Sequence, residues 1–462
     1  MTINRHFINT LDSQLDTTVT VAGFVNGLRD HGKVLFIVLA DHSGQVQVVA
    51  TAKQEGFDQL RTLTLGSALA ISGQVVKRPV HLTTVEPNGH LELQFSAIAS
   101  LNQAKELPWG NQLSESVNEE MGLTYRYLTI RHTDLMSKLQ WRSKINNFLR
   151  QYAIKDGFTE IETPYITKGT PEGAREYLIP SRLQPEHFYA LPQSPQQFKQ
   201  LLMVAGIDRY FQIARCFRDE DSRGDRQPEF SQFDCEMSYI TQDQIRTWLE
   251  QMMTTLVKEL LPNKQLTASP FPVISYQESM DRYGTDKPDL RQDKNNPDEL
   301  AFVWVNDQPM FERDESGQLS AVHHLFTRPK SEEPETALTD PNSAIADSYD
   351  LVLNGYEVAG GSIRIHEPEL QAKIFEILNL TPQVTEERFG HLLRALSYGA
   401  PPHGGFAIGL DRLIMLLVGG QSIREVIAFP KTGDGRDLMM QAPAQIEPQE
   451  LDQYGLTFKP KR

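Results

Sequence analysis

Cysteine is scarce in this 462-residue chain, and long apolar runs and an excess of basic charge are missing. Its cysteines, Cys216 and Cys235, are too few for a disulfide framework or a cysteine-rich zinc site. No apolar run reaches the length of about 18 residues that a membrane-spanning helix needs. The N-terminal segment MTINRHFINTLDSQLD has no apolar stretch typical of a secretory signal. We therefore expect a cytoplasmic protein without a membrane partner.

The charge balance is acidic, since 45 Lys and Arg stand against 60 Asp and Glu, a net charge of −15. Such a charge disfavours binding to nucleic acid in bulk. The charge is uneven, because residues 1–106 hold 8 basic and 9 acidic residues, which leaves −14 for the rest of the chain. One local RNA site therefore stays possible.

The common phosphate-binding loops are absent as well. Neither GxxxxGK[ST] nor a strand–GxGxxG–helix unit occurs in the sequence. A nucleotide would have to be held by other groups. Arginine can do this, because its guanidinium is permanently charged and forms bidentate hydrogen bonds to phosphate.

Alternating apolar residues near the N-terminus predict a small β-domain. A short helix is expected over 54–63, and the predicted strands cover residues 19–25, 33–40, 46–50, 68–76 and 91–98. Three strands, a helix and two strands is the order of an OB-fold barrel, although another small β-domain is an alternative. OB-folds commonly stack bases of single-stranded nucleic acid on aromatic side chains. We assign residues 1–104 to this barrel and the polar residues 105–132 to a linker.

From Thr133 the apolar period becomes that of a helix, which ends before Gly157. Helices then mix with antiparallel-looking strands, such as 301–306 and 362–366, so the chain as a whole is expected to be α+β. Residues 327–347 are rich in Pro, Glu, Asp and Ser and predict a mobile loop.

Three segments concentrate groups that suit a nucleotide. Residues 216–230, CFRDEDSRGDRQPEF, interleave arginines with aromatic rings between two strand-like runs, although a solvated hairpin tip is the alternative. Residues 349–366 contain two carboxylates, Asp350 and Glu357, whose oxygens suit Mg²⁺. Residues 404–413 run from a glycine-rich strand into an apolar helix that carries Arg412. Each segment alone would more often be structural.

Together these segments resemble the class II aminoacyl-tRNA synthetases, most closely the bacterial aspartyl-tRNA synthetases, over nearly the whole chain. The three class II motifs correspond to the helix and the segment FTEIETP that ends at Pro164, to FRDE at 217–220 and to GLDR at 409–412. The segments TPEGAR at 170–175, ALPQSPQQFKQ at 190–200 and GAPPHGG at 399–405 also resemble that family. The resemblance implies an OB-fold β-barrel joined to a class II catalytic domain, residues 133–462, built on an antiparallel sheet flanked by helices.

The resemblance also implies an ATP site with Arg218 and Arg412 as catalytic residues. Arg218 would bind the α-phosphate, Glu220 the adenine amino group, and Phe230 would stack on the adenine. The implied ATP-binding residues are Arg218, Asp219, Glu220, Gln227, Phe230, Glu357, Gly409, Leu410, Asp411 and Arg412. Asp350 and Glu357 would hold Mg²⁺ as the cofactor.

An L-aspartate site is implied in the same way. Its residues would be Glu172, Ser194, Gln196, Lys199, Arg218, Asp234, His323, His324 and Arg364. Lys199 and Arg364 would grip the side-chain carboxylate and so reject asparagine, which would leave buried charges unpaired. A bare histidine pair is by itself more often a metal or core feature.

On the barrel, the family's anticodon-binding positions correspond to Arg29, His31, Phe36, Gln47 and Glu92, although each could be ordinary barrel surface. In the family, a histidine at the place of His31 goes with enzymes that charge both tRNA-Asp and tRNA-Asn. The implied partners are therefore tRNA-Asp, tRNA-Asn, ATP, L-aspartate and a second copy of the chain in a C2 homodimer.

One departure concerns the large domain that the bacterial family carries between its second and third motifs. Here only the seven residues 292–298 bridge the flanking segments, so we expect that domain to be absent. Two other functions are conceivable: a relative that uses aspartyl-adenylate on another acceptor, and a non-enzymatic RNA-binding regulator. The barrel argues against the first, and the presence of Arg218, Asp350, Glu357 and Arg412 argues against the second.

Overall fold

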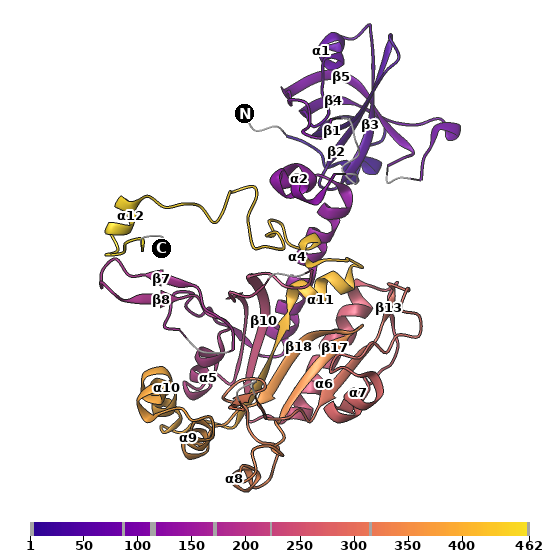
Figure 1. Ribbon diagram of the computed structural model, residues 1–462. Helices are drawn as coiled ribbons and strands as arrows, with labels where there is room; N and C mark the ends of the chain where they lie inside the picture. Colours follow the sequence, from indigo (N-terminus) through magenta and orange to yellow (C-terminus); the bar gives the residue numbers. More distant parts are fainter. Residues whose placement is uncertain are drawn as a thin grey trace. The chain divides into compact units, whose positions relative to one another are not determined.

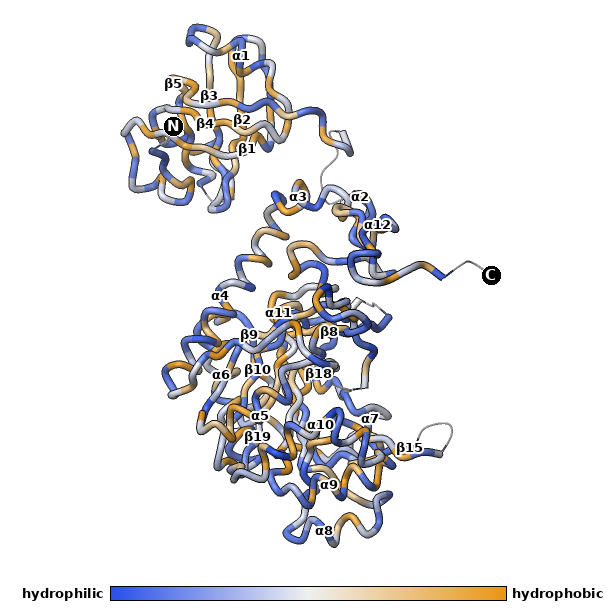
Figure 2. The backbone as a smooth tube through the Cα atoms, turned by 90° about the vertical axis from the view of Figure 1, so that its left-hand side faces the viewer, coloured by the Kyte–Doolittle hydropathy of each residue, from blue (hydrophilic) through white to orange (hydrophobic). Residues whose placement is uncertain are grey.

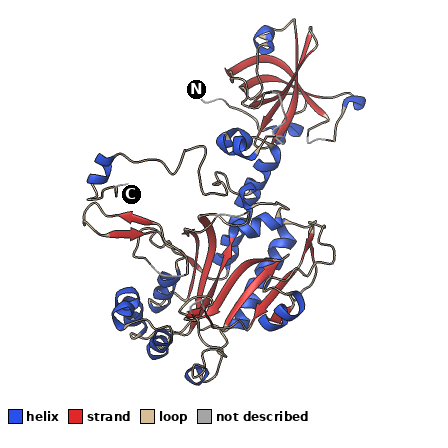
Figure 3. Cartoon of the chain, viewed as in Figure 1, coloured by secondary structure: helices blue, strands red, loops and turns tan. Residues whose placement is uncertain are grey.

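The computed structural model describes residues 4–85, 88–110, 117–169, 173–221, 224–313 and 317–459. The chain forms two compact units, one of residues 1–122 with 127–132 and one of residues 123–126 with 133–462. Strands dominate the first unit, whereas the second combines strands with many helices (Figure 3). Among the described helices, none has both the length and the apolar character needed to cross a membrane.

The first unit is a closed five-stranded barrel with the strand order β1-β2-β3-β5-β4. Its strands are β1 (Thr18–Asp30), β2 (Val34–Asp41), β3 (Gly44–Thr51), β4 (Ala68–Lys77) and β5 (Leu91–Asn102), with α1 (Phe57–Arg61) between β3 and β4. The predicted OB-fold order is confirmed. Alternate residues of β2, such as Leu35 and Ile37, fill the barrel, which leaves Phe36 on the outer face.

Strand β1 is longer than the sequence predicted. Its register with β2 shifts between Val25 and Gly27 and then continues to Asp30, so Arg29 pairs with Phe36. A bulge of this kind bends a strand without ending it. The extension therefore brings Arg29 into the sheet, where the sequence pattern placed a loop.

The second unit is built on an eight-stranded sheet with the order β12-β14-β17-β18-β19-β10-β9-β6. These strands are β12 (Val273–Ser275), β14 (Phe302–Asn306), β17 (Ser348–Leu353), β18 (Tyr356–Ile363), β19 (His403–Gly409), β10 (Glu229–Ser238), β9 (Arg209–Phe217) and β6 (Thr159–Glu160). The inner pairs are antiparallel, but β12 with β14 and β6 with β9 are parallel. The sheet is therefore mixed rather than purely antiparallel, because long connections at both edges allow parallel pairing.

The two faces of this sheet have different chemistry. Helices α4 (Thr133–Lys155), α6 (Gln242–Leu260) and α11 (Leu410–Leu417) contribute to the main hydrophobic core. Along β10, Phe233, Cys235 and Met237 belong to that core, so Asp234 and Glu236 lie on the opposite face. Figure 1 shows β10, β18 and β17 crossing this unit, and Figure 2 shows apolar residues recurring along the strands.

Helix α5 (Gln196–Val204) contacts β10, and α9 (Pro368–Ile377) contacts α10 (Pro382–Leu396). The irregular segment 327–347 is anchored, because Leu338, Ala344 and Ala346 pack in a hydrophobic cluster with residues of α9. We predicted a mobile loop because the segment is mostly polar, and its few apolar residues gave no sign of these contacts. The other elements are η1 (Ile8–Gln14), η2 (Val80–Leu82), α2 (Glu119–Thr124), α3 (Arg126–Thr129), β7 (Leu178–Pro180), β8 (Phe188–Ala190), β11 (Gln265–Leu266), α7 (Tyr276–Tyr283), β13 (Glu299–Leu300), β15 (Phe311–Arg313), β16 (Leu319–Ala321), α8 (Pro334–Ala337), η4 (Ile423–Glu425) and α12 (Pro448–Asp452).

Candidate active site

A cavity of about 290 Å³ brings the three charged segments of the sequence together. Its walls come from the loop between β9 and β10, from β10 and β18, and from the junction of β19 with α11. The predicted ATP-binding residues that line it are Arg218, Glu220, Gln227, Phe230, Glu357, Gly409, Asp411 and Arg412. We call this the arginine cavity.

Two predicted residues do not line the arginine cavity. The backbone N–H of Asp219 donates to the Arg175 carbonyl oxygen at 2.9 Å, and Leu410 is fully buried in the main core. Conversely, Asp225, Arg226 and Gln232 line the cavity although the sequence analysis did not select them. The sequence could have indicated them, since all three lie in or just after the arginine-rich loop.

The two predicted catalytic arginines have buried donors without a protein partner. The Arg218 guanidinium carbon lies 5.1 Å from the centre of the Phe230 ring. Arg412 donates to the Glu357 carbonyl oxygen at 2.6 Å and to the Asp225 carboxylate at 3.0 Å. Within the described part of the chain, the Nε atoms of both arginines are buried and have no acceptor. A buried, unsatisfied guanidinium N–H is costly alone and is well suited to a phosphate oxygen.

Gln227 and Asp411 line the arginine cavity but use their polar atoms within the protein. The Gln227 amide accepts from the Lys431 backbone N–H at 2.7 Å and donates to its carbonyl oxygen at 3.1 Å. The Asp411 carboxylate accepts from Arg142 Nη1 at 2.5 Å and from the Ser231 N–H at 3.2 Å. Both residues thus shape the cavity and fix its walls.

Asp350 and Glu357 direct carboxylate oxygens to one point over Gly360. A Cβ atom placed on Gly360 would lie 2.9 Å from Asp350 Oδ1 and 3.6 Å from Glu357 Oε1. Asp350 Oδ2 accepts from Gln308 Nε2 at 2.6 Å. Burial, and then the charge of Glu357, raise the pKa of the Asp350 carboxyl well above its usual range. A divalent cation between these oxygens would offset both effects.

Two carboxylates alone suit Mg²⁺ better than a metal that needs a protein cage. Among the described residues, no group of three or more His, Cys, Asp or Glu side chains converges as a metal site. Mg²⁺ is often held by one or two carboxylates together with substrate phosphates and waters. The residues present therefore fit Mg²⁺ bound jointly with a nucleotide.

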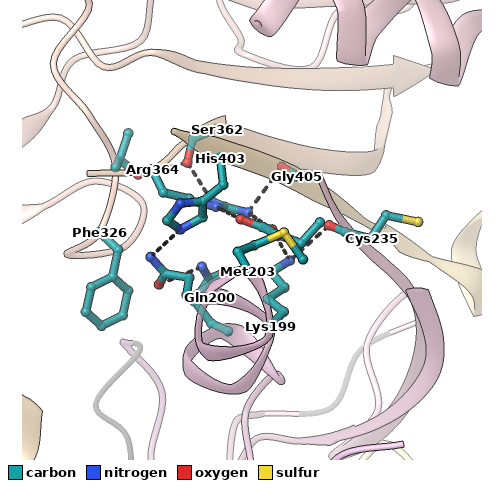
Figure 4. A network of polar contacts seen from close by, with 12 residues as sticks. Lys199, Gln200, Met203, Cys235, Phe326, Ser362, Arg364, His403 and Gly405 are labelled. Atoms are coloured by element: carbon teal, nitrogen blue, oxygen red, sulfur yellow. Dashed lines mark hydrogen bonds and ion pairs between the residues drawn. The ribbon is translucent and has the colours of Figure 1, made fainter. Parts of the chain in front are cut away.

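On the same face of the sheet, two cations and two carboxylates form a buried charge cluster of Lys199, Arg364, Asp234 and Glu236. Lys199 Nζ lies 2.8 Å from Asp234 Oδ2 and 3.3 Å from Glu236 Oε2. Arg364 donates to Glu236 at 2.9 and 3.1 Å. All four side chains are at most 2% exposed. Figure 4 shows Lys199 on its helix below Arg364.

Glu236 is the member of this cluster that the sequence analysis missed. Its position was indicated by the alternation of β10, which puts it on the same face as Asp234. Burial raises the pKa of the Asp234 carboxyl. Burial also opposes ionisation of Glu236, but Arg364 and Lys199 outweigh it and lower the pKa of that carboxyl. With both acids ionised, the cluster is electrically neutral.

Of the other predicted aspartate-binding residues, His324 contacts the cluster directly, whereas Arg218 lines the arginine cavity. Ser194 and Gln196 lie at the start of α5, the helix that carries Lys199. Gln196 is buried and donates to Gln200 at 3.1 Å, and Ser194 Oγ accepts from the Gln196 backbone N–H at 3.3 Å. His324 Nε2 contacts Arg364 Nη1 and lies 3.3 Å from Ser362 Oγ. Burial lowers the pKa of both His323 and His324, which favours neutral rings. Glu172 lies outside the described residues.

In the first unit, the five predicted anticodon-binding residues share one outer face, the barrel face. Arg29 Nη2 donates to Gln47 Oε1 at 3.0 Å, and Gln47 Nε2 donates to Glu92 Oε2 at 3.4 Å. The Arg29 guanidinium carbon is 5.8 Å from the centre of the Phe36 ring. The His31 ring meets that ring edge-on, with centres 5.6 Å apart. An aromatic side chain surrounded by polar groups is typical of a surface that binds unpaired bases.

Comparisons with known proteins identify the family of each part of the chain. Residues 118–433 match the family of class II tRNA synthetases (D, K and N), and residues 19–100 match the OB-fold nucleic acid binding domain family. The fold is similar to that of asparaginyl-tRNA synthetase from Pyrococcus horikoshii complexed with asparaginyl-adenylate. That similarity has a TM-score of 0.73 at 21% identity and covers 97% of this chain and 100% of the other.

Two curated relatives are similar over almost their full length. The aspartate–tRNA(Asp/Asn) ligase of Dictyoglomus turgidum is 36% identical, covering 97% of each chain. The aspartate–tRNA ligase of Staphylococcus saprophyticus is 36% identical, covering 97% of this chain and 98% of the relative. The chain therefore belongs to the bacterial-type aspartyl-tRNA synthetases, which are class II enzymes with an OB-fold domain.

Proposed function

We propose that this protein is an aspartate–tRNA ligase that activates L-aspartate with ATP and transfers it to the 3′ end of tRNA-Asp. The observation that carries the proposal is the continuity of two sites along β10. Gln232 lines the arginine cavity, and Asp234 and Glu236, on the same face of that strand, belong to the buried charge cluster. A nucleotide in the cavity and an amino acid at the cluster would therefore meet end to end.

In this arrangement the α-carboxylate of aspartate attacks the α-phosphorus of ATP. A bond forms between a carboxylate oxygen and phosphorus, and the bond from that phosphorus to the bridging oxygen breaks, so diphosphate leaves. Arg218 stabilises the charge that develops at phosphorus, and Phe230 stacks on the adenine. Asp350 and Glu357 would hold Mg²⁺, which when bound neutralises charge on the phosphates.

Charge counting explains why aspartate suits the buried charge cluster. The cluster is neutral, so a lone substrate carboxylate would add an uncompensated charge. Aspartate brings an ammonium as well, and Asp234 would bind that group while Lys199 and Arg364 bind the side-chain carboxylate. Its α-carboxylate is then left for Arg218. Asparagine brings the ammonium without the side-chain charge and would leave a buried positive charge unmatched.

We assign residues 1–104 to an anticodon-binding domain, 105–132 to a connector and 133–462 to the catalytic domain. Phe36 would stack on a base of the anticodon, while Arg29, Gln47 and Glu92 read base edges. His31 is at the rim of this barrel face and would contact the base that differs between tRNA-Asp and tRNA-Asn. The Dictyoglomus relative is named as a ligase for both tRNA-Asp and tRNA-Asn, which is compatible with charging of both by this protein.

A homodimer is supported by exposed apolar side chains on the second unit. Ile166 and Leu178 are 57% and 63% exposed, and both segments adjoin β8 through bridges to Ala190. Pro164, where the segment that resembles the first class II motif ends, lies two positions before Ile166. Large exposed apolar side chains on neighbouring segments are typical of a protein interface. Sedimentation should therefore give about twice the 52.4 kDa chain mass.

The proposed absence of the family's extra domain is supported by alignment length. The alignment to the Dictyoglomus relative spans 575 positions, which exceeds the 462 residues of this chain by 113. We propose that the seven-residue bridge 292–298 stands at the position where the family carries that domain.

The proposal is tested by aspartate-dependent exchange between ATP and diphosphate without tRNA, followed by aminoacylation of purified tRNA-Asp and tRNA-Asn. Wild-type protein should catalyse both reactions. Arg218→Ala should lose about 2.7–4 kcal/mol of transition-state stabilisation, as removal of a preorganised donor does. Exchange without aminoacylation of either tRNA would indicate another acceptor, and binding of tRNA without exchange would indicate a regulator.

A further inference from the structure

Lys287 lies against the Asp350/Glu357 pair, and neither the sequence motifs nor the proposed mechanism gives it a role. Its Nζ is 3.3 Å from Glu357 Oε2 and 3.9 Å from Asp286 Oδ2. Lys287 and Glu357 side chains are each 37% exposed, so the contact is at the edge of solvent. The ammonium thus faces the same acidic group that closes one side of the arginine cavity.

The backbone around Lys287 is held from several sides. Helix α7 ends at Tyr283 and is capped by Gly284, and Ser279 Oγ donates to the Thr285 carbonyl oxygen at 2.7 Å. Thr285 Oγ1 then accepts from the Lys287 N–H at 3.1 Å. Arg291 and Asp289 form an ion pair at 2.7 Å just beyond. The side chain of a surface lysine usually samples many rotamers, but the backbone of Lys287 is fixed by these contacts.

The same loop packs on the turn between β17 and β18. A Cβ atom on Gly355 would lie 3.4 Å from Asp289 Cβ and 3.8 Å from the Lys287 carbonyl oxygen. Because Asp350 and Glu357 flank this turn, the lysine and the carboxylates are positioned by one structural unit. The fold therefore holds the Lys287 backbone close to these carboxylates.

We infer that Lys287 is the resident countercation of Glu357, that Mg²⁺ displaces it from the carboxylate, and that its ammonium then binds a phosphate oxygen of ATP. The inference rests on the proposed function for the nucleotide. A lysine is suited to both tasks, since it is a compact point charge on a flexible stem and a common phosphate ligand. The two carboxylates would repel each other without a nearby cation, and ATP adds negative charge beside them.

The inference makes two predictions of opposite sign for Lys287→Met. Without the competing ammonium, the apoprotein should bind Mn²⁺, used as a paramagnetic probe for Mg²⁺, about fivefold more tightly; this equals about 1 kcal/mol, the upper range for an exposed ion pair. Without the phosphate contact, a non-hydrolysable ATP analogue at saturating Mg²⁺ should bind about tenfold more weakly. Lys287→Arg keeps the charge and should show smaller shifts in both.

Mn²⁺ binding is followed by electron paramagnetic resonance on full-length protein and analogue binding by calorimetry. Lys294→Met, a change at an exposed lysine in the neighbouring bridge, is the matched control and should alter neither quantity. Unchanged Mn²⁺ affinity, or unchanged analogue affinity, in Lys287→Met overturns the inference. Both titrations need no catalysis, so they can fail while wild-type exchange succeeds, which separates this inference from the proposed function.

Discussion

The buried charge cluster and the barrel face hold charged groups in opposite environments. In the cluster, Lys199 and Arg364 are almost fully buried and each has a carboxylate partner within 3 Å. On the barrel face, Arg29 and His31 are exposed, and Arg29 donates to a neutral amide. A charge out of water is strongly coupled to its partners, whereas solvent and salt weaken the coupling of an exposed charge. Amino-acid choice should therefore be strict and tRNA choice adjustable.

The largest expected effect is discrimination between the two amino acids. Aspartate should be preferred over asparagine by at least ~10⁴ in kcat/KM for exchange, because the buried cations would be left without their third carboxylate. The measurement is exchange of ATP and diphosphate with each amino acid, after removal of aspartate contamination from the asparagine. A preference below a hundredfold would mean that the cluster does not determine specificity.

The next effect concerns the stability that the cluster itself requires. Arg364→Met removes two donors from Glu236 and should lower the free energy of unfolding by about 3–5 kcal/mol, as breaking a buried ion pair does. Urea denaturation measures this change. Arg388→Met, at an exposed position of α10, is the control and should change stability by at most ~0.5 kcal/mol.

A double variant sharpens that test. Arg364→Met combined with Glu236→Met replaces the pair by apolar groups and should recover part of the lost stability, since no buried carboxylate is left without its cation. If the double variant is less stable than Arg364→Met alone, charge pairing is not the reason for the loss.

A smaller effect is expected on the barrel face. Phe36→Ala removes the ring on which a base would stack and should weaken tRNA binding by about 1–3 kcal/mol. The KM for tRNA should rise, while exchange without tRNA stays at the wild-type rate and serves as the internal control. Loss of exchange in this variant would show that Phe36 supports the fold rather than RNA binding.

The smallest effect concerns His31. The wild-type protein should charge both tRNA-Asp and tRNA-Asn, and His31→Leu should shift the preference toward tRNA-Asp by up to about tenfold, or 1.4 kcal/mol, as one exposed contact allows. His42→Leu, an exposed histidine at another barrel turn, is the control. A wild-type rate on tRNA-Asn below about a hundredth of that on tRNA-Asp, roughly 2.7 kcal/mol, would show a strict enzyme.

Sequence reasoning predicted the barrel and half of the residues that line the arginine cavity, because both depend on local patterns. The period of two along β2 placed Phe36 outside, and the arginine-rich loop pointed to Arg218. Sequence reasoning could not identify Glu236 as the partner of Arg364. The two residues are 128 positions apart, and their contact depends on the order of the strands in the sheet. Likewise, nothing local showed that Asp411 is bound by Arg142 from α4, 269 positions away.

The alternation of β10 has a consequence for folding as well as for binding. From Gln232 to Met237 its odd-numbered residues are apolar and its even-numbered residues are polar or charged. A pairing error of one position against β19 would turn Asp234 and Glu236 toward the main hydrophobic core and Phe233 toward the face of the buried charge cluster. Asp234 and Glu236 thus also help to specify the register of β10. Deleting a single residue from the middle of β10 should prevent folding altogether, although every side chain of the arginine cavity would still be encoded.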